Sequence, residues 1–335
     1  MNSSKWRSRS SENEPHVLKV DEPRQLLGVH ADLMEGALGP GEKILYLIYS
    51  PLWESEKALL DLRKATGAHW ESKKEILRVP VYPSSNAVAV TEKRFVISED
   101  RHLQGILPTV QSIPYDRVVS VRLGSALLLG WFTMQYEENE KLASTALLYP
   151  ARTGIGHFHR AVREYRKRLK PIDGHQRLPS RLWAEVWLRA SNLQMERLQF
   201  LQREAEYPSF LIHSSETWST VKKFWRRIPV CTKMKSLFVA TNFGFFYAVD
   251  EPPKKPGMRK LGVDVCCLPS EAIKSAVLAE EPGEGKIPPF LKLGVGRKST
   301  QAHMEIPLDL DASRSASDLV RWLASGRSVA PRRLG

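Results

Sequence analysis

The sequence predicts an α+β fold with two bent antiparallel sheets, close to barrels, each capped by a C-terminal helix and joined by a helical connector. Three observations predict it: short β-rich segments between turn residues, an order of these segments that occurs twice, and a middle segment with helical periodicity. The chain has 335 residues, 42% of them hydrophobic and 26% charged. This composition suits two packed domains and excludes a disordered or low-complexity polymer.

The first half is predicted to contain short strands followed by a helix. The strands are recognised by β-branched and aromatic residues, by alternation of apolar and polar residues, and by flanking turns. They are predicted at 44–49, 87–90, 94–98, 111–123, 127–136 and 145–149. A helix is predicted over 155–169, because Phe158, Val162, Tyr165 and Leu169 form an apolar stripe at spacings of three and four.

The same order of segments occurs again in the second half. Residues 87–100 align without a gap on 237–250, and residues 113–123 align on 268–278. A helix predicted at 317–324 closes the second copy, as 155–169 closes the first. Because a repeat determines the architecture of a chain, this match predicts two units of the same fold.

Two motifs in each copy carry a resemblance to a known family. The first copy contains ValThrGluLysArgPheValIle at 90–97 and IleProTyrAspArgVal at 113–118. The second contains AlaThrAsnPheGlyPhePheTyr at 240–247 and LeuProSerGluAlaIle at 268–273, with Ser270 in place of the tyrosine and Gly244 in place of the arginine. The pattern resembles the bacterial pleckstrin-homology-like (PH-like) domains of the YokE and GRAM-like type. The resemblance implies tandem PH-like units, each a bent sheet plugged at one end by its C-terminal helix.

The resulting division of the chain has five parts. They are a leader (1–38), a first PH-like domain (39–170), a basic helical connector (171–230), a second PH-like domain (231–326) and a basic tail (327–335). Within the connector, residues 181–204 lack proline and glycine and are predicted to form one long helix. A second, shorter helix is predicted from Ser214 to about Arg227, with Trp218, Val221 and Trp225 along one side.

The positive charge is concentrated in the middle of the chain. The formal net charge is +13, and residues 152–235 contribute 18 Lys and Arg against seven acidic residues. Such a run either coats solvated helix faces or forms a site for a polyanion or an anionic lipid surface. The candidate binding residues are Arg163, Arg166, Lys167, Arg168, Lys170, Lys222, Lys223, Arg226 and Arg227, with Trp218 and Trp225 as interface aromatics.

No motif in the sequence predicts catalysis, a cofactor or a metal site. The adjacent Cys266 and Cys267 are interpreted as one buried and one exposed side chain of a strand, because neighbouring thiols do not suit chelation. His157 and His159 could both face outward beside a helix start, but they lack a third ligand. The glycine-rich segment 294–299 lacks the spacing of a phosphate loop and is interpreted as a hairpin turn.

The sequence therefore favours a non-catalytic binding or scaffold protein with tandem PH-like modules. Its expected partner is a protein or an anionic membrane surface, and the alternative is a nucleic acid bound by the basic segment 152–235. An unrecognised enzyme is the third hypothesis. Three cysteines, a polar start and the lack of a long apolar run predict a cytoplasmic protein without a transmembrane segment. Binding to an anionic membrane would make it peripheral at the inner membrane face.

Overall fold

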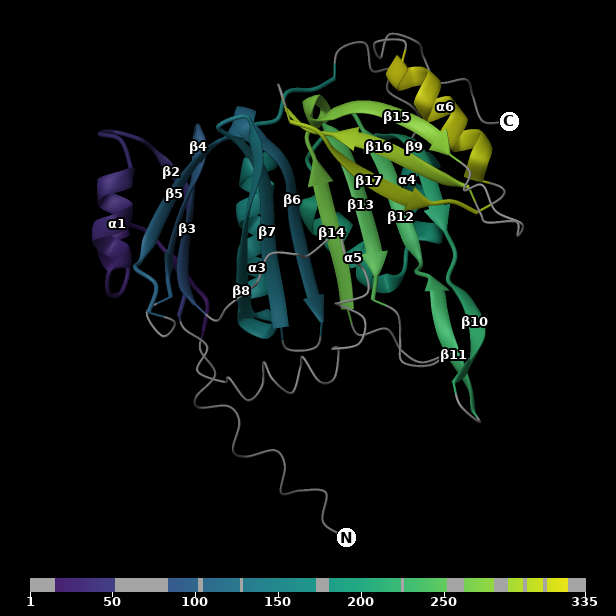
Figure 1. The fold of residues 1–335 in the computed structure, drawn as a ribbon. Helices are drawn as coiled ribbons and strands as arrows, with labels where there is room; N and C mark the ends of the chain where they lie inside the picture. The colour runs from purple at the N-terminus through teal and green to yellow at the C-terminus, as the bar shows by residue number, and fades with distance from the viewer. Residues whose placement is uncertain are drawn as a thin grey trace.

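The protein folds into antiparallel sheets covered by helices, and the class is α+β. The computed structural model describes residues 16–51, 84–101, 105–126, 129–172, 181–223, 226–251, 262–279, 289–297, 300–309 and 312–324. These residues form four antiparallel sheets and five α-helices (Figure 1). The expectations for Trp225 and for the tail (327–335) lie outside the described residues.

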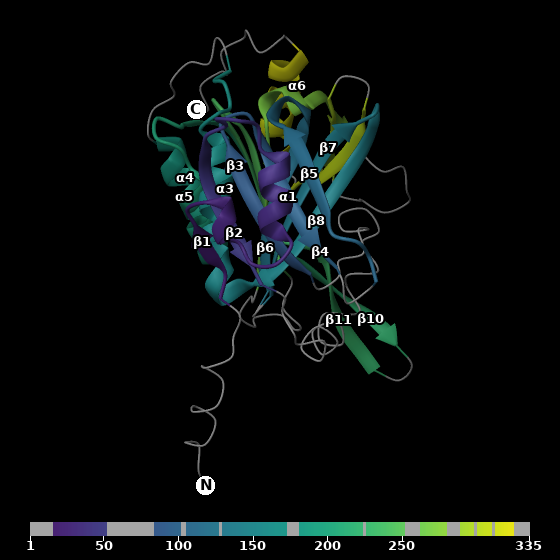
Figure 2. The same cartoon turned by 90° about the vertical axis from the view of Figure 1, so that its left-hand side faces the viewer.

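The first sheet has five strands in sequence order and contains the first two predicted hairpin strands. Its strands are β1 (Leu18–Val20), β2 (Ile44–Ser50), β3 (Ser85–Thr91), β4 (Arg94–Asp100) and β5 (Thr109–Pro114). Helix α1 (His30–Ala37) contacts β4 and β5 and lies against this sheet (Figure 2). Part of the segment assigned to a leader, residues 16–38, thus packs on the first sheet through β1 and α1.

The second sheet joins the two halves of the chain. Its first three strands are β6 (Val118–Ala126), β7 (Leu129–Glu138) and β8 (Lys141–Pro150). Its other four are β9 (Pro208–Ser214), β12 (Ser236–Thr241), β13 (Gly244–Asp250) and β14 (Gly262–Leu268). The order is β8-β7-β6-β14-β13-β12-β9, with β6 antiparallel to β14 and Val121 opposite Cys267.

The sheets are open, so the expectation of nearly closed barrels is wrong. The edge of β14 does not close a barrel, because it pairs with β6 from the other half of the chain. This junction also corrects the interpretation of the cysteines. Cys266 and Cys267 are both buried, at 1% and 2% exposure, because β14 lies in the middle of a sheet whose two faces are covered by different clusters of the core.

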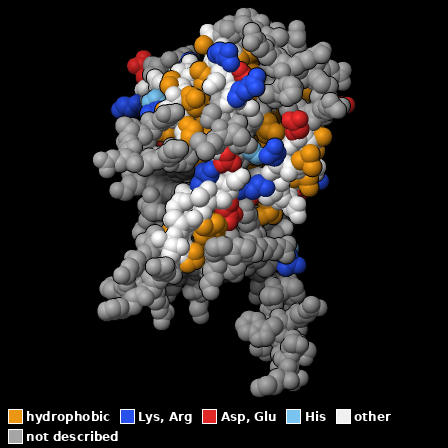
Figure 3. Space-filling view, turned by 90° about the vertical axis from the view of Figure 1, so that its right-hand side faces the viewer, with side chains coloured by type: hydrophobic (Ala, Val, Ile, Leu, Met, Phe, Trp, Pro, Cys, Tyr) orange, Lys and Arg blue, Asp and Glu red, His pale blue; other side chains and the backbone are white. Residues whose placement is uncertain are grey.

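A third sheet and the last helix complete the second half. The strands β15 (Ile273–Ala279), β16 (Phe290–Val295) and β17 (Ala302–Pro307) form a meander, and the pairing of β16 with β17 places 294–297, the described part of the glycine-rich segment, in a hairpin. Helix α6 (Ser313–Ala324) contacts β15 and β9. On the side of the molecule seen in Figure 3, the described apolar, basic and acidic side chains are interspersed.

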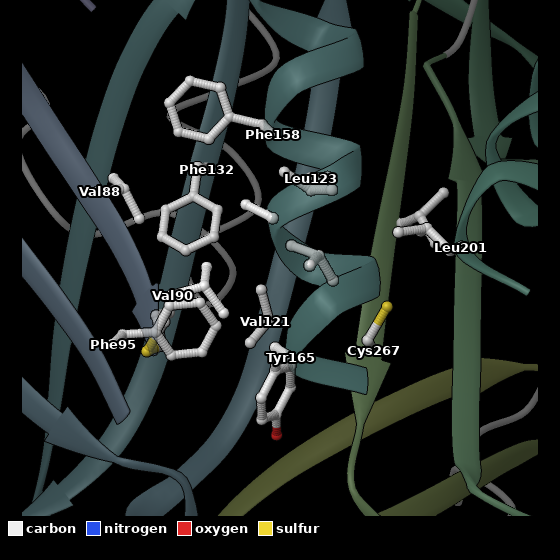
Figure 4. Close-up of a cluster of buried hydrophobic side chains, with 14 of the residues drawn as sticks. Val88, Val90, Phe95, Val121, Leu123, Phe132, Phe158, Tyr165, Leu201 and Cys267 are labelled. Atoms are coloured by element: carbon white, nitrogen blue, oxygen red, sulfur yellow. The ribbon is translucent and has the colours of Figure 1, made fainter. Parts of the chain in front are cut away.

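Helix α3 (Ala151–Arg166) fills the space between the first two sheets. It contacts β2 and β3 of one sheet and β6, β7 and β8 of the other. The predicted stripe is confirmed for Phe158, Val162 and Tyr165, which are fully buried. The helix lies earlier than the predicted 155–169, so Leu169 follows its end and is half-buried. The Phe158 ring stacks on Tyr149 with 4.0 Å between centroids, and Tyr165 packs between strands of both sheets (Figure 4).

The strand pairings of the two halves match position by position. Phe95 lies opposite Ile113 in the first half, and Phe245 lies opposite Leu268 in the second, the same residues that the sequence aligns. The first and second strands of each four-stranded meander are β2 and β3 in one half and β9 and β12 in the other. An irregularity falls between Ile44 and Tyr46 in the first pair and at the aligned place, between Ala240 and Thr241, in the second.

The turns of the two halves match as well. Glu42 ends a turn in which the Gly39 amide donates to its carboxylate at 3.1 Å, and Glu206 ends a turn in which the Arg203 amide does the same at 2.8 Å. The third turn residue has a positive φ in both, 71° at Gly41 and 57° at Ala205. In the hairpins that follow, the hydroxyls of Thr91 and Thr241 donate to the carbonyls three residues later.

The connector contains two helices where one long helix was expected. Helix α4 (Arg181–Arg189) ends before Ser191, and α5 (Asn192–Leu201) begins after it. The Ser191 hydroxyl accepts from the Gln194 amide at 3.1 Å, and the Gln194 side chain accepts from the Ser191 amide at 3.0 Å. This capping box starts a new helix in a segment that has neither proline nor glycine.

The second helix predicted for the connector is also wrong, because that segment is a β-hairpin. Strands β10 (Thr217–Lys223) and β11 (Arg226–Lys233) pair with each other in a sheet of their own. Thr217, Trp218, Thr220 and Val221 are β-branched or aromatic, and residues of this type fit a pleated surface better than a helix. The residues just before them form β9, an outer strand of the seven-stranded sheet.

Candidate polyanion-binding surface

The outer side of α3 carries a row of cations. Arg160, Arg163 and Lys167 are exposed and follow one another at spacings of three and four, which places them along one side of α3 and at its C-terminal end. Lys170 is exposed in the segment that follows the helix. Arg168 is exposed beside them. We call Arg160, Arg163, Lys167, Arg168 and Lys170 the basic helical face. Arg160 was absent from the predicted set, although the same spacing rule would have included it.

The basic helical face is held by the core, and Glu164 of the same helix pairs with one of its cations. The opposite side of α3 is buried between two sheets, so the cations cannot move independently of the core. Lys167 pairs with Glu164 at 2.6 Å, but the lysine side chain remains 48% exposed. Cations at a helix C-terminus are stabilised by the helix dipole, so part of this charge has a structural role.

An exposed aromatic ring lies beside this face. Phe200 of α5 is 44% exposed, and its ring stacks on that of His159 with 5.6 Å between centroids. His159 is the residue before Arg160, so Phe200 contacts the same helix turn of α3 from which Arg160 projects. The combination of an exposed ring with a cationic helix side is typical of surfaces that meet the polar and apolar layers of a membrane.

Arg166 does not belong to this surface, which corrects the prediction that it binds a polyanion. Its side chain is buried and forms a two-pronged ion pair with Glu206, at 2.6 Å and 3.0 Å. It also donates to the Leu201 carbonyl and lies over the Phe246 ring. Burial alone would lower the pKa of Arg166, but the pKa is raised because Glu206 stabilises the cation. Sequence spacing could not identify this role, because Glu206 lies forty residues away.

The second predicted basic cluster lies on the β10–β11 hairpin. The backbone register places Lys222 opposite Arg227 and Lys223 opposite Arg226, so the four basic residues share one end of the hairpin. Their side chains, and Trp225, lie outside the described residues. Trp218 is half-buried near the base of the hairpin and donates to the Glu216 carboxylate.

The structure does not bring the two basic clusters together. The α3 end is tied through Arg166 and Glu206 to Thr241, the last residue of β12. The hairpin begins near Ser214 and Ser236, which pair at the opposite end of β12. A six-residue strand spans about 17 Å, and the hairpin projects away from the sheets in both views (Figures 1 and 2). The clusters are therefore separate surfaces.

The histidines and cysteines are parts of the packed structure. His157 is half-buried and its Nδ1 lies 3.0 Å from the Tyr46 hydroxyl, whereas His159 is 1% exposed, so the expectation that both face outward is wrong. Burial, followed by the charge of Arg197, lowers the pKa of His159 to about 3. Burial raises the pKa of Cys267 to about 12. Among the described residues, no group of three His, Cys, Asp or Glu could hold a metal ion.

Comparison with known proteins gives this chain no relative. No family model matches it, and no curated protein matches it. In the part of the chain that the structure describes, no helix combines the length and apolar character needed to cross a bilayer. The function has to be inferred from the surfaces themselves.

Proposed function

We propose that this protein is a non-catalytic binding protein with two tandem PH-like units, and that it docks on an anionic membrane surface through the basic helical face. The observation that carries the proposal is the exposed row of Arg160, Arg163, Lys167 and Lys170, with Phe200 beside it, on a helix held by the core. A cytoplasmic location at the inner membrane face follows from this proposal.

The tandem arrangement is supported by features that have no reason to coincide otherwise. Each half has a helix, a turn ending in glutamate, four antiparallel strands, a 3-10 turn, three more strands and a closing helix. The register shift in the first strand pair of each half, described above, falls at aligned positions. A second register shift, between Val118 and Ser120, is also aligned with the shift between Ile273 and Ser275. Because bulges are inherited within families, their recurrence favours duplication.

Under this proposal the second unit begins earlier than the sequence indicated. Helix α5 takes the place of α1, because each helix bonds to the same two positions of its sheet. His30 of α1 bonds to the hydroxyls of Ser85 and Ser98. Gln194 of α5 donates to the carbonyls of the aligned residues, Lys235 and Ala248. The unit then includes β9 and carries the β10–β11 hairpin as an insertion. The two units share the seven-stranded sheet, so they present their surfaces to a partner in a fixed orientation.

Vesicle flotation tests the membrane proposal. The full chain should float with vesicles that contain phosphatidylserine and remain at the bottom with pure phosphatidylcholine. Each basic residue near an anionic surface contributes about 1 kcal/mol, so removing two charges costs about 2 kcal/mol, roughly a 30-fold loss of affinity, and reversing them costs more. We therefore expect Arg160→Glu/Arg163→Glu to abolish flotation.

A matched control separates a specific face from general charge. Lys274→Glu/Arg314→Glu changes the net charge by the same amount at exposed positions on β15 and α6, and this variant should still float. Equal losses in both variants would reject the basic helical face. No flotation of the unmodified chain, together with retention on single-stranded RNA that falls steeply with salt, would favour the nucleic-acid alternative.

A further inference from the structure

Strand β5 is an outer strand of the first sheet, and none of the described residues pairs with its outer edge. Thr109, Val110 and Ser112 are exposed, and the strand from Thr109 to Pro114 contains no charged residue. Leu107, just before it, is 83% exposed, and Val110 is 37% exposed. Edge strands of stable monomers are usually protected by charges, prolines, bulges or a covering element, because their free amides and carbonyls pair with other strands. The prolines of this segment, Pro108 and Pro114, stand at its two ends and leave the residues between them able to donate.

The matching strand in the second half has its edge occupied. Strand β14 holds the same register to the strand before it as β5 does, with Phe245–Leu268 in place of Phe95–Ile113. Both strands are followed by a 3-10 turn, and the helices α5 and α1 contact them alike. The outer edge of β14 pairs with β6 in an antiparallel register. This position of the fold therefore accepts an antiparallel strand while its helix stays in place.

We propose that the outer edge of β5 pairs with β5 of a second copy of this chain, antiparallel and about a two-fold axis. A two-fold axis brings one edge against the same edge with the polarity that antiparallel pairing needs. Because β5 is neutral, the pairing places no like charges opposite each other, although the chain carries a net charge of +13. The contact would also cover the exposed Val110 and Leu107 side chains.

Three other described outer strands carry lysines, and the outer strand β9 is contacted by α4 and α6. Strand β15 carries the exposed Lys274 and is contacted by α6, while β1 has only three residues, with Lys19 at its centre. Strand β8 begins with the exposed Lys141. The inference rests on the duplication proposed above for the match between β5 and β14, and it is independent of the basic helical face.

Sedimentation of the full chain over a range of concentrations tests the proposal. We expect a monomer–dimer equilibrium that saturates at two copies. Val110→Glu places two carboxylates across the two-fold axis and should weaken the dimer at least tenfold, whereas Val277→Glu, at a 55% exposed position of β15, should leave it unchanged. Far-ultraviolet circular dichroism of both variants confirms that they are folded.

Hydrogen exchange locates the contact. Amides of 109–113 should exchange more slowly in the dimer than in the monomer, with no change in β15. A chain that stays monomeric at about 100 μM would overturn the proposal. It would also be overturned by open-ended assembly with protection of β15, because that result indicates pairing of β15 with β5. Flotation of a monomeric chain would leave the proposed membrane function standing while this inference failed.

Discussion

Replacing Arg166 by methionine should destabilise the protein severely, because it leaves a buried negative charge without its cation. Both side chains of the pair are at most 1% exposed, and the two oxygens of Glu206 each bind one guanidinium nitrogen. Removing one member of a buried ion pair costs about 3–5 kcal/mol. The Thr241 hydroxyl, at 2.6 Å, and the Arg203 amide still donate to Glu206, so we expect the lower half of that range.

Urea unfolding measures this loss, and the neighbouring residue gives the control. Lys167→Met breaks an exposed pair one position along the helix and should change the free energy of unfolding by less than about 0.5 kcal/mol. For a body of 335 residues, 3 kcal/mol corresponds to a fall in Tm of about 4 °C. A loss below about 1 kcal/mol for Arg166→Met would show that the pair is not buried as described.

A double-mutant cycle separates the ion pair from the packing of the arginine. Arg166→Met/Glu206→Gln removes both charges and keeps groups of similar size, so it should be less destabilising than the sum of the two single variants. The coupling should be well above that of a surface pair, because both groups are away from water. Additive effects would contradict the assignment of Glu206 as the partner of Arg166.

Three further outcomes follow from local geometry. Gly154→Ala should destabilise the protein, because the added Cβ would lie 2.5 Å from the Tyr149 ring. Gly156→Ala adds a Cβ with nothing within 4 Å and should stabilise α3 by about 0.5–1 kcal/mol, and thermal unfolding of both variants shows whether the two effects have opposite signs. His159 is neutral in the folded chain, so its contribution to the free energy of unfolding is complete above about pH 6.5 and is lost as the pH falls toward 3. Between pH 7 and 5 the unfolding free energy of the unmodified chain should fall by about 2 kcal/mol more than that of His159→Phe. Equal pH dependence of the two chains would contradict the burial of this ring. Ser191→Ala should cost about 1 kcal/mol in urea unfolding through loss of the α5 cap, while an unchanged midpoint would mean that the cap is dispensable.

Local sequence signals predicted the elements whose pattern and packing agree. The hairpin around Thr91 and the helix over 155–169 were predicted because alternation in one and helical spacing in the other coincide with the buried faces. The prediction of one helix over 181–204 is wrong at Ser191, where a local capping box starts a second helix despite the uninterrupted helical periodicity. The helix predicted from Ser214 to about Arg227 is wrong, because the β-branched and aromatic residues of β10 favour a strand more strongly than the capping residues before them favour a helix.

Long-range pairing explains the errors at the candidate site. Arg166 has the same sequence context as Arg163 and Lys167, and only the turn that ends at Glu206 makes it a buried residue. Cys266 and Cys267 alternate as in a one-sided strand, and only the pairing of β14 with β6 places both in the core. Neither fact has a local signal, because each depends on residues more than thirty positions away.

The two glutamates that end the matching turns explain why the halves act as one body. In the first half, Glu42 binds Arg94, which belongs to the adjacent hairpin, and this pair lowers the pKa of Glu42 to about 2 despite partial burial. The residue aligned with Arg94 is Gly244, where a Cβ would lie 2.4 Å from the Leu268 carbonyl oxygen, so this position of the hairpin offers no cation to Glu206. Glu206 takes Arg166 from α3 of the other half instead. The turn glutamate of the first half is thus paired within its own half, whereas the turn glutamate of the second half is paired by an arginine of the first half. The second half thus depends on its neighbour for both a cation and a strand, and the surfaces of the two halves keep one fixed geometry.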